Sequence, residues 1–310
     1  MKLLPNTIIN FHDIYDKPWM EKTLLLLKKC YRIVGIGEVE KFYYQQYALK
    51  NACHITFDDG DKSFYNIVFP LLKKHQIPVS IYVSPLIALQ ETNFWFQEIR
   101  GYEEHKVQEI IKRRRAYNGP DHKTPLGALL KNMTLETIWE VINEYQRATG
   151  TVPKPGLNMT PEQLREVQSS GLVAVGAHTM NHPILKNEND DMAREEIQTS
   201  LHLLRAMINS EICAFAYPNG EPGLDFGQRE IHILKSSGIK LAFSTENKTF
   251  SQNDGPLSIP RIVITHGRSK GYILLKLLLG RHWNLMTRVL KGKRETDYRK
   301  KLIKNYMRFS

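Results

Sequence analysis

The chain has 310 residues, 42% of them hydrophobic, which excludes a disordered or collagen-like protein and suits one large globular domain or two small ones. Its net charge of +11 is uneven, because residues 261–310 carry a balance of +12 and residues 1–260 a balance of −1. No apolar run reaches the ~20 residues that span a bilayer, and the start lacks the apolar region of a secretory signal. We therefore expect a cytoplasmic protein whose three widely spaced cysteines are reduced thiols.

The first part of the chain has the pattern of a parallel α/β sheet. Apolar, β-branched runs at 6–14 and 51–60 predict strands. Residues 63–78 have apolar positions at helical spacing, with Pro70 bending the helix or marking a boundary, and 78–85 predicts another strand. Strand, helix and strand in this order predict a parallel sheet with right-handed crossovers.

The pattern changes from about residue 90 to residue 155. This segment is charged, mostly helical in its spacing and interrupted by Gly119 and Pro120. We interpret it as a helical insertion that decorates the α/β body and could cover a site, because as a separate domain its core would be thin.

The α/β alternation then resumes. Thr160 is predicted to cap a helix, with Pro161 at the first helical position and Gln163 at the capping-box spacing. The later predicted elements are strands at 172–178, 212–218, 239–245 and 257–265 and helices at 192–209 and 226–237. Repeated units of this kind favour a TIM-like barrel of eight or fewer units, in which chemistry gathers at the carboxyl ends of the strands.

Charged and imidazole side chains follow three of these strands: His12, the pair Asp58 and Asp59, and the pair His178 and His182. Separately, each has an ordinary explanation, such as an Asp-Gly turn or a hydrogen-bonded core histidine. Together, two imidazoles and one carboxylate form a three-ligand set with open positions, which suits catalytic Zn²⁺ or Fe²⁺, Co²⁺ or Ni²⁺. One aspartate can then bind the metal while the other accepts a proton from water that the metal activates.

These residues resemble the motifs of the polysaccharide deacetylase family, which is carbohydrate esterase family 4, or the NodB-homology domain. "TFDDG" at 56–60 matches the first motif, "HTMNHP" at 178–183 matches the His-[Ser/Thr]-x-x-His-Pro motif, and "FAYPNG" at 215–220 resembles the third. The resemblance covers roughly residues 1–265 apart from the insertion at about 90–155, and leaves residues 266–310 as a basic C-terminal tail. It implies a distorted (β/α)₇ barrel.

The resemblance also implies a role for each matching residue. Asp59, His178 and His182 would bind the metal, and Asp58 would be the general base. The third motif would contribute the backbone N–H of Asn219, which helps to stabilise the oxyanion, and Tyr217 and Pro218, which line the sugar groove.

The sequence departs from the family pattern in three respects. Many members have Arg where this chain has Ala216, so an ion pair that positions the base is missing, and Arg261 is a candidate to supply that charge from another strand. No Asp-x-x-Asp-Trp fourth motif is found. For the general acid, His266 could imitate the fifth motif, but we favour His12, because the first strand resembles that of the poly-N-acetylglucosamine deacetylases.

We therefore predict a metal-dependent deacetylase that removes acetyl from an N-acetylated sugar, as expected in building a cell-surface glycan. The first alternative is a pseudoenzyme that keeps the groove to bind glycan. The second is a nucleic-acid binder, suggested by the basic tail. A solvated helix face explains the tail's charge better, because no nucleic-acid motif accompanies it.

The C-terminal tail has a further interpretation. Residues 271–294 combine clustered leucines with lysine and arginine, the composition of an interfacial helix, although the same leucines could close the end of the barrel as ordinary core. Large apolar residues are few from 291 on. We expect these basic residues to hold the protein at the anionic inner face of the membrane.

Overall fold

The computed structural model describes residues 4–114, 124–280, 283 and 295–306. Its strands pair in parallel in one sheet, in the order β7-β6-β5-β4-β3-β1-β8, with the short β2 added beside β3. The strands are β1 (Thr7–Phe11), β2 (Arg32–Ile33), β3 (Ala52–Phe57), β4 (Val79–Val83), β5 (Val173–Ala177), β6 (Ala214–Ala216), β7 (Leu241–Phe243) and β8 (Ile262–Val263).

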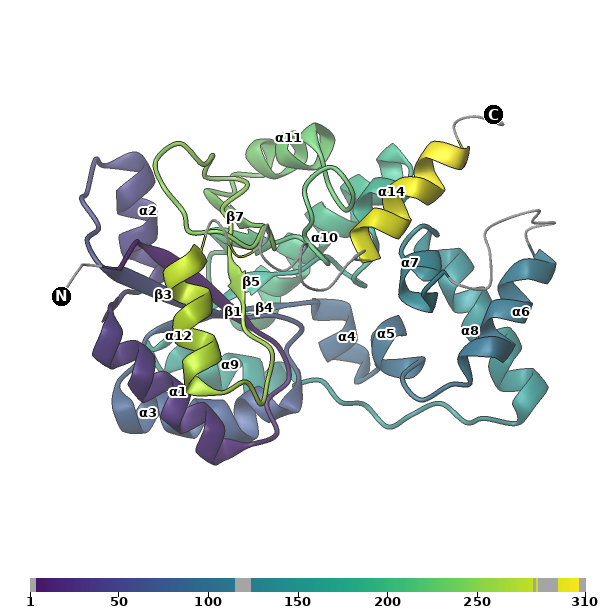
Figure 1. Cartoon of the computed structure of the whole chain (residues 1–310), viewed down its shortest axis with the longest axis horizontal. Helices are drawn as coiled ribbons and strands as arrows, with labels where there is room; N and C mark the ends of the chain where they lie inside the picture. Colours follow the sequence, from purple (N-terminus) through teal and green to yellow (C-terminus); the bar gives the residue numbers. More distant parts are fainter. Residues whose placement is uncertain (1–3, 115–123, 281–282, 284–294, 307–310) are drawn as a thin grey trace.

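The segment that leads into β8 joins the two edges of the sheet. Ile259 forms a parallel bridge with Phe243 of β7, and Ile262 pairs with Ile9 of β1. The sheet therefore curls on itself with helices outside it (Figure 1), and the predicted (β/α)₇ barrel class is confirmed.

The central strands are buried along their whole length, which explains why their sequences are continuous apolar runs and not alternating ones. No element was predicted between the first two long strands, where the structure has β2 and two helices. The helices around the sheet are α1 (Lys17–Cys30), α2 (Ile36–Tyr44), α3 (Phe69–His75), α4 (Pro85–Gln90), α9 (Pro161–Ser169), α10 (Asp190–Ile208) and α11 (Gln228–Ser236).

Two local predictions about helix ends can be compared with the structure. Pro70 lies in the first turn of α3, where its missing N–H costs least, and the turn before it, Phe64–Val68, is a π-helix. The capping box of α9 is confirmed, because the Thr160 hydroxyl accepts from the Gln163 N–H while the Gln163 side chain accepts from the Thr160 N–H.

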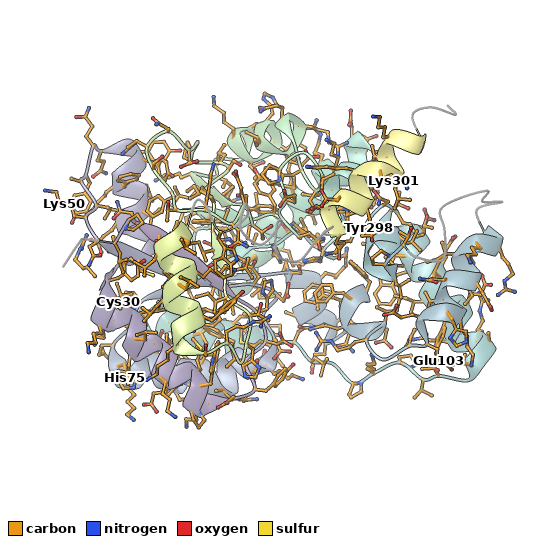
Figure 2. All side chains as sticks on the ribbon, viewed as in Figure 1. Cys30, Lys50, His75, Glu103, Tyr298 and Lys301 are labelled. Atoms are coloured by element: carbon orange, nitrogen blue, oxygen red, sulfur yellow. The ribbon has the colours of Figure 1, made fainter. Side chains whose placement is uncertain are left out.

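The insertion forms a helical unit beside the barrel, with α5 (Trp95–Glu98), α6 (Glu104–Arg114), α7 (Leu126–Leu130) and α8 (Leu135–Thr149). Figure 2 separates the two parts, with Cys30 and His75 on the barrel and Glu103 on the insertion. The insertion has a small core of its own, which includes Val107, Ile138 and Ile142. The predicted interruption at Gly119 and Pro120 lies outside the described residues.

The C-terminal region begins with α12 (Lys270–Leu279), in which the Lys276 Nζ donates to the carbonyl oxygen of Val263 in β8. Ile273 and Leu277 are buried in the main core, so part of its leucine-rich face does pack as ordinary core, while Leu275 and Leu278 stay exposed. No helix among the described residues is long and apolar enough to cross a membrane.

The last described helix, α14 (Glu295–Tyr306), packs on α7 of the insertion. Arg299 is 2% exposed, forms an ion pair of 2.7 Å with Asp225 and donates to the carbonyl oxygens of Lys131 and Leu224. The shortage of large apolar residues from 291 on does not prevent this helix from packing, because one of its basic residues is a buried docking group. Attachment to an anionic membrane and a cytoplasmic location stay predictions.

Candidate active site

The polar residues predicted to meet do lie at one edge of the sheet. Phe11 pairs with Phe57 across β1 and β3, and β3, β4 and β5 follow in parallel, so His12, Asp58 and His178 each come directly after the last residue of a strand. Because the strands are parallel, these carboxyl ends share one end of the barrel.

Asp59, His178 and His182 form a compact buried group. The Asp59 Oδ1 atom lies 3.5 Å from His178 Nε2 and 3.7 Å from His182 Nε2, and the three ligand atoms lie within 4.8 Å of one another. Asp59 Oδ1 is a buried oxygen without a hydrogen-bond partner. A carboxylate oxygen and two imidazole nitrogens that converge in this way fit a divalent cation, which would satisfy the unpartnered oxygen.

The local charges agree with a metal-binding role. Burial lowers the pKa of His182 to about 3, which keeps its imidazole in the neutral form that binds metals. Burial by itself raises the pKa of Asp59, but its contacts with His178 and the nearby His12 outweigh burial and hold the pKa below the ordinary value. Asp59 is thus ionised.

The two histidines are oriented by groups behind them. His178 Nδ1 lies 2.7 Å from the carbonyl oxygen of Ala216, so this nitrogen donates and Nε2 is left as the ligand atom. The ring of His182 lies edge-on to Phe94 and Phe96 at 5.4 and 4.9 Å, and Trp95 Nε1 donates to the His182 carbonyl oxygen. One of the two imidazoles is therefore supported from the insertion.

The loop between the histidines has a strained backbone, because Thr179 and His182 have φ of 65° and 59°. Glu196 of α10 braces it: its buried carboxylate accepts from the N–H groups of Met180 and Asn181, both at 2.9 Å. The loop holds its shape through these contacts, which no local sequence signal indicated.

Asp58 is held by Arg261, as the sequence analysis suggested. Arg261 Nη1 and Nη2 donate to the two carboxylate oxygens at 2.7 and 2.8 Å, and Asn10 Nδ2 donates at 2.7 Å. Burial raises the pKa of Asp58, but the guanidinium charge and hydrogen bonds hold it below its ordinary value. Arg261, the residue just before β8, thus supplies the partner that Ala216 does not.

A cavity of about 360 Å³ opens over these groups. His12, His266 and Asn219 all line it, so the structure brings both candidate acids to the same cavity as Asp58 and Asp59. The His266 ring lies perpendicular to the ring of Trp19 at 5.1 Å, and its Nε2 atom is buried without a hydrogen-bond partner. The choice of His12 as the acid stays a prediction, as does the role of the Asn219 N–H.

We expect the His12→Ala variant to slow cleavage of an amide far more than cleavage of an activated aryl ester. An amine leaving group needs a proton and a phenolate does not, and general-acid catalysis contributes typically ~10²–10⁴-fold. Parallel rates on both substrates test this, with His266→Ala as the matched variant. A larger amide-specific loss in His266→Ala would assign the acid to His266, and equal losses on both substrates would make His12 structural.

Tyr217 and Pro218 lie elsewhere than predicted. Tyr217 is 1% exposed, stacks on Phe226 with ring centroids 3.6 Å apart and donates its hydroxyl to the Leu257 carbonyl oxygen. Pro218 is also buried, and neither residue lines the cavity. The expectation that they line a sugar groove is therefore wrong in this structure, because β6 directs this aromatic ring into the core.

Part of the cavity wall comes from the insertion. The contributing residues are Trp95, Phe96, Gln97, Arg100 and Lys131. Arg100 pairs with Asp13 at 3.3 Å and Lys131 with Glu295 at 2.9 Å. None of these residues was predicted from the sequence, in which the aromatic run at 94–96 is the one signal that points to them.

The parallel α/β barrel brings an aspartate and two histidines together at the carboxyl ends of its strands. A second carboxylate, held in an ion pair, lies beside them. This arrangement is that of a metal-dependent hydrolase. The family model described as polysaccharide deacetylase matches residues 120–242, which include His178 and His182. This match agrees with the resemblance to polysaccharide deacetylases that the motifs indicated. The Asp58 and Asp59 pair lies outside the matched residues.

Two curated relatives carry the same name, poly-beta-1,6-N-acetyl-D-glucosamine N-deacetylase. The relative from Staphylococcus epidermidis is 21% identical over 83% of this chain and 70% of its own length. The relative from Staphylococcus aureus strain MSSA476 is 24% identical over 70% of this chain. This chain spans about half of that protein's length, 55%.

Solved structures show the same fold at low sequence identity. The Streptococcus pyogenes deacetylase PplD in complex with acetate aligns with a TM-score of 0.60 at 19% identity, covering 89% of this chain and 99% of that one. IcaB from Ammonifex degensii aligns with a TM-score of 0.59 at 18% identity, covering 88% and 96%. These likenesses support the barrel assignment.

Proposed function

We propose that this protein is a zinc-dependent N-deacetylase that removes acetyl from N-acetylhexosamine units of a surface glycan or its precursor. The observation that carries the proposal is the ion pair of Asp58 and Arg261 beside the group formed by Asp59, His178 and His182. The names of the curated relatives favour a β-1,6-linked N-acetylglucosamine polymer.

The chemistry divides among these side chains. A divalent cation held by Asp59, His178 and His182 would supply Lewis acidity, which polarises the acetyl carbonyl and lowers the pKa of water to ~7. Asp58, kept ionised by Arg261, takes a proton from the attacking water. His12 gives a proton to the departing amine, and the Asn219 N–H, at the cavity wall, donates to the developing oxyanion. Zinc is favoured by the two-imidazole donor set, with cobalt, nickel and iron as the alternatives.

The pseudoenzyme alternative loses much of its support from this geometry. It rested on Ala216 and the absent fourth motif, yet the base has an arginine partner from another strand. A retired site has no need to keep a buried bidentate pair beside three convergent metal-binding side chains.

Acetate release tests the proposal. The chain is stripped of metal, reloaded with zinc, cobalt, nickel or iron, and assayed on N-acetylglucosamine, on β-1,6-linked oligomers and on nucleotide-linked and lipid-linked sugars. We expect metal-dependent release, fastest with zinc and with oligomers, and none from O-acetylated glycans that lack N-acetyl groups. Oligomer binding without release under every metal would favour the pseudoenzyme.

A further inference from the structure

Tyr15 stands out among the exposed large apolar side chains of the described residues. Its side chain is 56% exposed, and its interacting groups all belong to residues that line the catalytic cavity. The hydroxyl donates to Asp61 Oδ2 at 3.5 Å, and the ring lies perpendicular to that of His266 with centroids 6.5 Å apart. Two further tyrosines are exposed among the described residues, Tyr44 and Tyr47, and these hydrogen bond to Lys240 and Glu38, which do not line this cavity.

The backbone on either side of Tyr15 is anchored. The N–H of Ile14, itself 1% exposed, donates to Ser63 Oγ, and Asp16 caps α1 by accepting from the Trp19 N–H. The exposed ring is thus held in place before any ligand arrives, so that a ligand does not have to order it. Burial of the hydroxyl, with Asp61 and Asp13 nearby, raises the pKa of Tyr15 to about 12, so it remains a neutral donor.

We propose that Tyr15 is a stacking platform for a second sugar of the substrate chain, next to the sugar whose acetyl group enters the cavity. This inference rests on the proposed function and specifies its substrate class as an oligomer or polymer of hexopyranose units. The apolar C–H face of a pyranose ring complements the electron-rich face of an aromatic ring, and the hydroxyl of Tyr15 can reach a sugar hydroxyl. A fixed, half-exposed tyrosine at the rim of a polar cavity offers both the aromatic face and the hydroxyl.

The test compares oligomer and monosaccharide in one variant series: wild type, Tyr15→Ala, Tyr15→Phe and, as matched control, Tyr44→Ala, whose tyrosine is 54% exposed. The measured quantity is the ratio of kcat/KM on β-1,6-linked N-acetylglucosamine oligomers to kcat/KM on the monosaccharide. We expect Tyr15→Ala to lower this ratio about tenfold through KM, which is equivalent to ~1.4 kcal/mol, because the stacking contact with the second sugar is lost. Tyr44→Ala should keep the wild-type ratio, and Tyr15→Phe should lower it less than Tyr15→Ala does, because phenylalanine keeps the ring and loses only the hydroxyl.

Two outcomes would overturn the inference. Equal losses on oligomer and monosaccharide would mean that Tyr15 acts through His266, and unchanged kcat/KM on both substrates in Tyr15→Ala would mean that no sugar reaches it. Calorimetric titration of the oligomers separates this result from a failure of the proposed function. If wild type released no acetate, weaker oligomer binding by Tyr15→Ala alone would still support the platform, and equal binding by all variants would refute it.

Discussion

The Asp58→Asn variant should keep its metal and lose deacetylation by roughly 10²–10⁴-fold, the range of general-base catalysis. Asparagine preserves the shape of the side chain and can still accept a hydrogen bond from Arg261, but it cannot take up a proton. The metal-binding group of Asp59, His178 and His182 is left intact. Metal content and acetate release, measured on the same preparation, give both parts of the result.

The matched control is Asp59→Asn, the neighbouring carboxylate. It should lose metal and activity together, because Asp59 Oδ1 is the atom that faces both imidazoles. If Asp58→Asn lost its metal while Asp59→Asn retained it, the roles of the two aspartates would be reversed. Circular dichroism on each variant confirms that the fold is kept.

The Arg261→Met variant should lower the free energy of unfolding by about 3–5 kcal/mol, because it leaves the Asp58 carboxylate buried without its counter-charge. Arg261 is 0% exposed and Asp58 3%, so water cannot replace the lost partner without opening the barrel. Denaturant unfolding followed by circular dichroism measures the change.

The control for this prediction is Arg32→Met. Arg32 forms its ion pair with Glu38 at the surface, with 47% of its side chain exposed, and its loss should cost no more than ~1 kcal/mol. Replacing both Arg261 and Asp58 by apolar residues should recover much of the stability while activity stays lost. A cost for Arg261→Met as small as that for Arg32→Met would contradict the buried-pair interpretation.

The parts of the site that depend on local sequence were predictable. Asp59 and His178 follow buried apolar runs, and parallel strands bring their carboxyl ends together wherever the strands lie in the sheet. Arg261 was predictable only as a candidate, because its contact with Asp58 depends on how the last strand closes the barrel beside β1. Nothing near position 261 indicates that closure.

Burial and long-range packing decided the predictions that were wrong. Tyr217, the aromatic residue of the third motif, suggested a sugar contact. Its ring stacks on Phe226 in the core instead, and this direction depends on the orientation of the backbone at the end of β6. The wall formed by Trp95, Phe96 and Lys131 depends on how the insertion packs on the barrel. The docking of α14 through Arg299 appears in sequence only as one more positive charge in a basic run.

The ion pair of Asp58 and Arg261 also bears on how the protein is made. Its two residues are 203 positions apart, and chains are synthesised from the N-terminus, so the base exists long before its partner. Until the last strand leaves the ribosome, a carboxylate destined for the barrel interior has no counter-charge, which disfavours early closure. The active site therefore matures only when the chain is available through β8, and fragments that end before β8 are expected to be both open and inactive.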